Sequence, residues 1–223
     1  MSTVLFVVTG ARTWTLSDGT AHPTGYWAEE LLAPYRLLVG AGHDVAVATP
    51  GGVVPVVDEG SIADDEEARA ALAAIPGLQR PLVLAEVDPG AFDAVFYPGG
   101  HGPMEDLARD AASGALIVRA LDAGTPLALV CHGVAALLAA KRSDGALAAA
   151  GRTVAAFTDE EERQGGLAPK APWLLESTLR DGGIAVDAAE PWADHVVEDG
   201  ALVTGQNPQS SASVARALLA RLS

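Results

Sequence analysis

Cysteine is nearly absent from this chain, which has only one in 223 residues. A single cysteine cannot form an internal disulfide, so the sequence does not point to an oxidising compartment. Basic residues are also scarce, with 14 lysines and arginines against 29 acidic residues and a net charge of −15. No basic cluster is longer than Lys141-Arg142, so nucleic acids and anionic membranes are poor partners.

Long apolar runs are missing as well. No stretch reaches the length of a membrane span, and the opening MSTVLFVVTGARTW lacks the basic start of a secretory signal. We therefore expect a cytoplasmic protein with no membrane partner. Apolar residues still make up 49% of the chain, which is enough for a sizeable core in a single domain over residues 1–223.

Short apolar runs alternate with longer helical patterns, a spacing typical of parallel βαβ units. Because the strands are apolar throughout, we expect a sheet that is covered on both faces. The predicted fold class is α/β, with a doubly wound, mainly parallel sheet sandwiched by helices. Residues 53–75 form a peripheral excursion, and Ser210 and Ser211 are candidate N-caps of the last helix. Strands are predicted over 3–10, 44–50, 92–100, 125–133, 153–157, 184–187, 195–197 and 201–204, and helices over 25–42, 172–181 and 209–222.

The one cysteine stands between an apolar strand and the start of a helix, in LALVCHGVAALL. This layout is that of a nucleophile elbow, where a tight turn exposes the side chain at the end of the sheet. Such a turn is crowded, which suits the small residues Gly133 and Ala135. A helix N-terminus would lower the pKa of the Cys131 thiol and make it reactive. The alternative is a buried cysteine that packs as a small apolar side chain.

A reactive thiol needs a base, and His132 follows the cysteine directly. The imidazole in turn needs an acidic partner to fix its tautomer. Gly99 and Gly100 of YPGGHG could let backbone N–H groups form an oxyanion hole, with the N–H of His132 as a further donor. Candidates for the acidic partner are Asp159, Glu160, Glu161 and Glu162.

Cofactor signals are weak or missing. No phosphate-binding GxxxxGK[ST] or GxGxxG motif occurs, so no organic cofactor is expected. His101 with Glu105 or Asp106 is too loose a set for a confident metal site, and we expect no metal.

Several segments resemble one known family, and they follow in order along nearly the whole chain. The sequence resembles the ThiJ/PfpI superfamily, which is related to class I glutamine amidotransferases, and within it the heat-shock-protein-31-like, glyoxalase III branch. The resemblance implies a flavodoxin-like sandwich with a reactive cysteine at the elbow. The segments are TGYWAEELLAPY, ATPGGVVPVVDEGSI, YPGGHGPMEDL, LALVCHGVAALL, GRTVAAFTDEEE, LLESTLRDGG and EPWADHVVEDGALVTGQNPQSS.

The resemblance also implies roles for individual residues. Glu30 falls on a carboxyl that hydrogen-bonds the cysteine and shuttles a proton, and Glu162 falls on the acidic partner of His132. One departure concerns the substrate, since Glu105 stands where branch members commonly carry an aromatic residue. Trp14 is a further candidate for the pocket wall, whereas Trp192 and Asn207 are expected to be structural. The implied oxyanion and substrate-binding residues are Gly99, Gly100, His101, Tyr26 and Trp27.

The activity implied by the resemblance is that of a glutathione-independent glyoxalase, which converts methylglyoxal to lactate through a cysteine hemithioacetal. Its partner would be a small reactive aldehyde, and a homodimer is expected because relatives often dimerise. Two enzymatic alternatives use the same residues: a cysteine hydrolase of the amidase or peptidase type, and a protein deglycase. The non-enzymatic alternatives are a redox-sensing stress protein, in which Cys131 is oxidised, and a holding chaperone.

Overall fold

Seven strands form one sheet in the computed structural model, which describes residues 1–63 and 65–222. The strand order is β10-β11-β7-β6-β1-β4-β5. All neighbours are parallel except β10 and β11, so the predicted mainly parallel sheet is confirmed. The strands are β1 (Thr3–Val7), β4 (Asp44–Thr49), β5 (Leu82–Val83), β6 (Ala94–Tyr97), β7 (Leu127–Val130), β10 (Val196–Asp199) and β11 (Leu202–Gly205).

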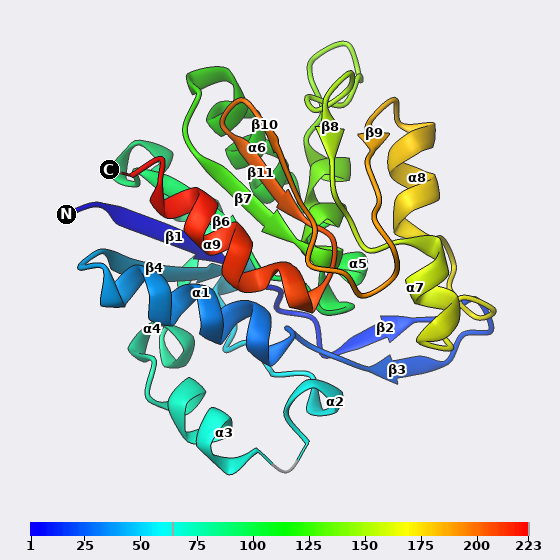
Figure 1. Cartoon of the computed structure of the whole chain (residues 1–223), viewed down its shortest axis with the longest axis horizontal. Coiled ribbons are helices and arrows are strands. Elements are labelled where there is room, and N and C mark those ends of the chain that lie inside the picture. Colours follow the sequence, from blue (N-terminus) through cyan, green and yellow to red (C-terminus); the bar gives the residue numbers. More distant parts are fainter. Residues whose placement is uncertain (64, 223) are drawn as a thin grey trace.

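Helices cover both faces of this sheet, as the continuous apolar strands require. Figure 1 shows α1 and α9 side by side over one face, with α6 and the segment after β7 behind the sheet. The excursion at 53–75 carries α2 and α3 at the periphery, where α3 contacts α1. The α-helices are α1 (Ala28–Gly40), α2 (Glu59–Ile62), α3 (Glu66–Ala73), α4 (Pro76–Gln79), α5 (Gly102–Glu105), α6 (Ala111–Ala123), α7 (Asp159–Gln164), α8 (Leu175–Asp181) and α9 (Ser211–Leu219).

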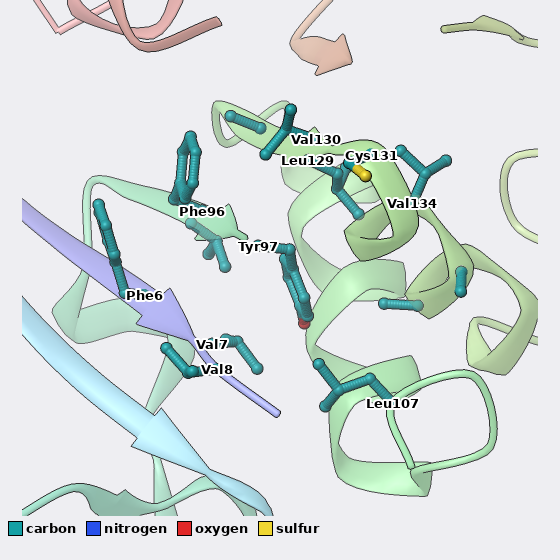
Figure 2. Packing of buried hydrophobic residues seen from close by; sticks show 14 of the residues in the cluster. Phe6, Val7, Val8, Phe96, Tyr97, Leu107, Leu129, Val130, Cys131 and Val134 are labelled. Carbon is teal, nitrogen blue, oxygen red and sulfur yellow. The ribbon is translucent and has the colours of Figure 1, made fainter. Parts of the chain in front are cut away.

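The core is densest around the central strands. All four residues of β6 and all four of β7 are buried, and Phe6 of β1 stacks on Phe96 of β6 with ring centroids 4.8 Å apart. Figure 2 shows this packing, with Cys131 directly beyond the end of β7. Burial of these side chains fixes the register of β1, β6 and β7, and the carboxyl ends of the three strands therefore meet at one edge.

Two features of the strands differ from the sequence-based expectations. The runs at 153–157 and 184–187 form only two-residue strands, β8 (Thr153–Val154) and β9 (Ala185–Val186), which pair with each other outside the central sheet. An unpredicted antiparallel pair, β2 (Thr13–Thr15) and β3 (Ala21–Pro23), precedes α1. Both of its strands are three residues long and mostly exposed, so they carry no apolar run by which to find them.

Of the two candidate caps of the last helix, Ser211 is the first residue of α9 and not its cap. Ser210 occupies the N-cap, as predicted, although its side chain makes no capping hydrogen bond. Its hydroxyl instead accepts the backbone N–H of His195, because the loop before β10 lies against it. Within the described residues, no helix is both long and apolar enough to cross a membrane.

Candidate active site

Cys131 stands at a strained turn at the carboxyl end of β7. Its φ of 55° lies in the left-handed region, which non-glycine residues seldom adopt. A 3₁₀ helix, η4 (Cys131–Ala139), follows in place of the expected α-helix. The turn packs tightly against β6, since a Cβ atom at Gly133 would lie 2.5 Å from the carbonyl oxygen of Tyr97. Strain of this kind is held by the surrounding packing and is frequent at functional sites.

The thiol, the adjacent imidazole and a carboxylate form a continuous series. The Sγ atom of Cys131 lies 3.3 Å from Nδ1 of His132, and Nε2 of the same ring lies 2.8 Å from Oε2 of Glu162. A carboxylate accepts only, so His132 carries its proton on Nε2 and leaves Nδ1 free to accept the thiol proton. Of the four acidic candidates, Glu162 is the one against His132, at the position that the resemblance implied.

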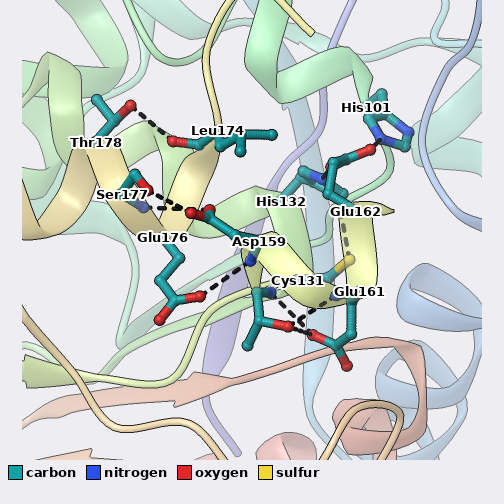
Figure 3. A network of polar contacts seen from close by, with 11 residues as sticks. His101, Cys131, His132, Asp159, Glu161, Glu162, Leu174, Glu176, Ser177 and Thr178 are labelled. Atoms are coloured by element: carbon teal, nitrogen blue, oxygen red, sulfur yellow. Dashed lines mark hydrogen bonds and ion pairs between the residues drawn. The ribbon is translucent and has the colours of Figure 1, made fainter. Parts of the chain in front are cut away.

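A second imidazole shares the same carboxylate. Nε2 of His101 lies 3.0 Å from Oε1 of Glu162, so the carboxylate bridges two histidines, as Figure 3 shows. The His101 ring lies between Trp14 and His132, with centroid distances of 5.0 Å and 4.1 Å. Trp14 is fully buried behind His101, where it supports the ring and does not line the cavity.

Burial and hydrogen bonding shift the pKa values of both Glu162 and His132. Desolvation alone would raise the pKa of Glu162, but hydrogen bonds from His101 and His132 and their charges hold it well below its usual range. Desolvation and the neighbouring His101 lower the pKa of His132, against the opposing effect of Glu162. Near pH 7 the series therefore holds an ionised carboxylate and a neutral His132, which is the form that can accept a proton.

Glu30 reaches the thiol from α1 and is completely buried. The backbone N–H of Gly99 donates to its Oε2 at 2.7 Å, while Oε1 has no regular hydrogen-bond partner. Desolvation raises the pKa of Glu30 to about 8, and the Gly99 N–H and the Cys131 thiol oppose that rise. The Gly99 N–H thus fixes one oxygen, and the carboxyl interacts with the neighbouring Cys131 thiol.

The expected lowering of the thiol pKa is wrong. Desolvation, followed by the charge and hydrogen bond of Glu30, raises the pKa of Cys131 well above its ordinary value, and the N–H of His132 only partly compensates. A thiol with a raised pKa reacts as a nucleophile only where a base takes its proton, and Nδ1 of His132 lies 3.3 Å from the Sγ atom.

The two glycines of YPGGHG have different surroundings. Gly99 commits its N–H to Glu30 and is therefore no oxyanion donor, contrary to expectation. Gly100 lines the cavity, and its N–H has no partner among the described residues. Glycine is required here because φ is 88° and a Cβ atom would lie 2.5 Å from the Gly25 carbonyl oxygen. The N–H of Gly100 is the one left available for a developing oxyanion.

The cavity at Cys131 has a volume of about 290 Å³. Trp27 lines it, as expected, but Tyr26 does not: its side chain borders a separate cavity beside α2 and α3. Trp192, expected to be structural, also lines the cavity, whereas Asn207 is buried and donates to Glu161. The lining comprises Gly100, His101, Cys131, His132 and Glu162, the apolar residues Trp27, Phe157, Leu167, Trp192 and Pro208, and His22, Asp58 and Gly165.

Glu105 and Asp106 do not join His101 in a metal site. Glu105 accepts the backbone N–H of Thr15 in β2, and Asp106 accepts the hydroxyl of Thr9 in the loop after β1. Glu105 does not line the cavity. The glutamate that stands where an aromatic residue was expected therefore does not change the cavity wall. Among the described residues, His101, His132 and Glu162 form a group that could hold a metal, with ligand atoms within 4.8 Å of one another. Their mutual hydrogen bonds explain the arrangement without an ion.

Glu161 is a residue whose role the sequence did not reveal. Its buried carboxylate accepts the N–H and hydroxyl of Thr158, the N–H of Trp192, and the side-chain amides of Gln206 and Asn207. It thereby ties α7 to the loop that carries Trp192. The pattern Thr-x-x-Glu, a capping-box signature, was the signal available for part of this role.

Comparison with known proteins agrees with this geometry. Over 135 residues the chain is 38% identical to the probable glutathione-independent glyoxalase hsp3104 of Schizosaccharomyces pombe, a match that covers 57% of this chain and 60% of that protein. It is 28% identical to the protein/nucleic acid deglycase HchA of Staphylococcus aureus, over 93% of this chain and 75% of that one.

Among solved structures, the chain is similar to Rapid Encystment Protein 24 kDa of Francisella tularensis, with a TM-score of 0.90, 27% identity and full coverage of both chains. The model of the DJ-1/PfpI family matches residues 23–221, nearly the entire chain and every residue of the Cys131 series described above. The chain therefore belongs to the DJ-1/PfpI family, on the glyoxalase III-like side that its sequence motifs indicated.

Proposed function

We propose that the protein is a glutathione-independent glyoxalase, which adds water to a 2-oxoaldehyde such as methylglyoxal and releases the corresponding 2-hydroxy acid. Cys131 is the nucleophile, His132 with Glu162 is its base, and Glu30 moves a proton between the two carbonyl carbons. The names of two relatives, a glyoxalase and a deglycase, support chemistry on reactive carbonyl compounds.

The observation that carries the proposal is the buried carboxyl of Glu30 beside the thiol. Hydrolysis by a cysteine needs the thiol, an imidazole and its partner, but it has no step for a second buried carboxyl. An isomerisation needs a group that takes a proton from one carbon and returns it to the next. With a pKa of about 8, Glu30 has both its protonated and ionised forms accessible near neutral pH, which suits that task.

The first step joins the thiol to the aldehyde. Nδ1 of His132 accepts the thiol proton as Sγ bonds to the aldehyde carbon, and that proton passes to the new oxygen to give a hemithioacetal. The N–H of Gly100 stabilises the negative charge that develops on the oxygen. No proton or electron is lost, since one carbonyl has become a hydroxyl and one S–H has become S–C.

The second step moves hydrogen between the two carbons. Oε1 of Glu30, as carboxylate, removes the hydrogen from the carbon bonded to sulfur, and an enediolate forms. Glu30 returns that proton to the neighbouring carbon, while His132 carries the hydroxyl proton from the first oxygen to the second. The product is a thioester with an adjacent hydroxyl. Water then hydrolyses the thioester, which releases the hydroxy acid and restores the thiol.

The test is lactate formation from methylglyoxal in the absence of glutathione. We expect the wild-type protein to form lactate and Cys131→Ser to form none, with both proteins folded by circular dichroism. A parallel assay with amide and ester substrates covers the hydrolase alternative. Turnover of those substrates without lactate formation would overturn the proposal in favour of a cysteine hydrolase.

Deglycase activity is a second candidate, favoured by the HchA relative. Adducts of 2-oxoaldehydes with amines or thiols present a carbon at the same oxidation level as the aldehyde, so the same thiol could displace the amine and continue through the same steps. Release of free lysine side chains from a methylglyoxal-treated peptide, faster than spontaneous dissociation of the adduct, separates this activity from removal of the free aldehyde.

A further inference from the structure

The cavity at Cys131 is larger and more aromatic than methylglyoxal requires. Its volume of about 290 Å³ approaches the roughly 300 Å³ at which pockets begin to enclose drug-sized ligands. Methylglyoxal places only one methyl group beyond its two carbonyl groups. With its aldehyde carbon bonded to Sγ, that methyl group would leave most of the apolar lining facing water.

The apolar wall begins at the reacting groups and extends away from them. The ring of Phe157 lies 4.3 Å from that of His132, and the ring of Trp192 lies 5.5 Å from that of Phe157 in an edge-to-face arrangement. Trp192 is 38% exposed, so the series of rings runs from the buried imidazole to solvent. All three residues line the cavity, and aromatic side chains at a cavity wall can pack against the ring of a ligand.

Trp192 is held in place by more than packing. Its φ of 65° is unfavourable for a side chain of this size, yet its N–H donates to Glu161 at 2.8 Å and its indole N–H donates to Gln164 at 2.6 Å. Because a buried carboxylate holds this strained residue, the cavity wall at Trp192 has a defined position. The exposed indole is thus fixed before a ligand arrives, which lowers the entropy lost on binding.

The charges that line the cavity also restrict which substituent a 2-oxoaldehyde substrate can carry. The carboxylates of Asp58 and Glu162 both line it, and each is held by hydrogen bonds, Asp58 from the Thr24 hydroxyl at 2.8 Å and Glu162 from the two imidazoles. A negatively charged substituent would be repelled by both carboxylates. The lining therefore disfavours a negatively charged substituent.

We infer that the preferred substrates are 2-oxoaldehydes with a neutral aromatic substituent, and that Phe157 and Trp192 determine this preference. The inference rests on the proposed glyoxalase function and specifies its substrate class. For phenylglyoxal the overall change is the addition of one water to give mandelate. The aldehyde carbon is oxidised to the carboxyl level and the ketone carbon is reduced to a carbinol, so no external oxidant or reductant is needed.

The test compares initial rates of mandelate and lactate formation from phenylglyoxal and methylglyoxal, without glutathione. Because phenylglyoxal also modifies arginine, products are quantified by chromatography at early times, with Cys131→Ser as the blank. We expect a higher kcat/KM for phenylglyoxal in the wild-type protein. In Trp192→Ala the ratio of the two kcat/KM values should fall roughly tenfold, the scale on which apolar pockets discriminate. Phe157→Leu, which keeps an apolar side chain in the buried position, should lower the same ratio.

Leu82→Ala is the matched control, since Leu82 is an exposed apolar residue at the edge strand β5 and does not line the cavity. Its ratio should equal that of the wild type. A higher kcat/KM for methylglyoxal, or a ratio unchanged in both Trp192→Ala and Phe157→Leu, overturns the inference while leaving the glyoxalase function intact. If the wild type turns over neither aldehyde, the proposed function fails, and the inference fails with it.

Discussion

At the residue scale, the central feature of the site is that the Glu30 carboxyl and the Cys131 thiol are buried next to each other. Glu30 has no exposed surface and Cys131 is 3% exposed, and burial raises the pKa of both groups. Near pH 7 the thiol is protonated, whereas Glu30 has both of its forms accessible. In the proposed mechanism, reaction therefore depends on the transfer of the thiol proton to His132 when the aldehyde is present.

The raised pKa of Glu30 predicts a pH-dependent stability. Unfolding returns this carboxyl from a pKa of about 8 to about 4.5, so between these values the unfolded state releases a proton that the folded state keeps. The free energy of unfolding then falls as pH rises, by about 1.4 kcal/mol per unit for one group. Glu30→Gln removes this titration and retains an acceptor for the Gly99 N–H.

We expect the stability of Glu30→Gln relative to wild type to increase by about 3 kcal/mol from pH 5 to 7.5. Denaturant unfolding at several pH values measures both proteins, and titrations common to the two cancel in the difference. A difference that stays constant with pH would show that the carboxyl is already ionised in the folded protein.

Glu162 should matter to turnover through the state of His132. In Glu162→Gln the amide nitrogen has to face one of the two imidazole Nε2 atoms, so at least one histidine loses its acceptor and changes tautomer or orientation. Loss of the acidic partner of a catalytic histidine costs on the order of 10²–10⁴-fold in kcat. We expect a loss of that size in kcat for methylglyoxal.

Glu160→Gln in the same helix is the control for this change. Glu160 pairs with Arg163 on the exposed side of α7 and has no contact with the imidazoles. Its kcat should stay within about twofold of wild type, as expected for an exposed pair of small energetic value. Equal losses in the two variants would indicate that the charge of α7, and not the bridge to His132, supports turnover.

At the element scale, the elbow depends on the close approach of η4 to the end of β6. The carbonyl oxygen of Tyr97 leaves no room for a side chain at Gly133, where a Cβ atom would lie 2.5 Å away. Gly133→Ala should therefore displace the turn that carries Cys131 and lower the free energy of unfolding by about 1–3 kcal/mol. Thermal and denaturant unfolding give the measurement.

Gly40→Ala provides the comparison for the same chemical change. Gly40 ends α1 without a positive φ, and a Cβ atom there would have no neighbour within 4 Å. Alanine should therefore be neutral or stabilising at this position by up to about 1 kcal/mol. If Gly133→Ala proved as stable as Gly40→Ala, the elbow would have more freedom than its packing indicates.

The position of Glu162 is also set at the element scale. Thr158 caps α7, and Glu161 turns back to it and to the loops at Trp192 and Asn207. The next residue along the helix then points to a different side, toward His132. Four consecutive acidic residues look alike in a sequence, because the capping geometry and the partners from distant loops that distinguish them appear only in the folded chain.

At the scale of the whole molecule, the apolar pattern of the central strands was sufficient to predict the parallel sheet and to place the cysteine at its carboxyl edge. The short strands β2, β3, β8 and β9 could not be found in the same way or placed correctly, since they bury little and pair only through tertiary contacts. Tyr26 and Trp27 are adjacent in sequence, and the backbone conformation at the start of α1 sends them to different cavities.

The direction of the thiol pKa shift was equally out of reach of the sequence. A strand, a cysteine and a helix start suggest a dipole that stabilises the thiolate. The opposing effect comes from burial and from Glu30, which is 101 positions earlier in the chain. Only the packing of α1 against the sheet brings that carboxyl to the thiol.

The proposed conversion of a 2-oxoaldehyde depends on Glu30 as proton carrier, and one comparison tests this role. Lactate formation from methylglyoxal is measured for Glu30→Gln and for Glu29→Gln, its exposed neighbour on α1. Glutamine preserves the shape of the site but cannot carry the proton, so kcat should fall at least roughly 100-fold in Glu30→Gln and remain near wild type in Glu29→Gln. Turnover in Glu30→Gln within a few-fold of wild type would contradict the proton-shuttle role and leave Cys131 as an aldehyde-reactive thiol that works by another route.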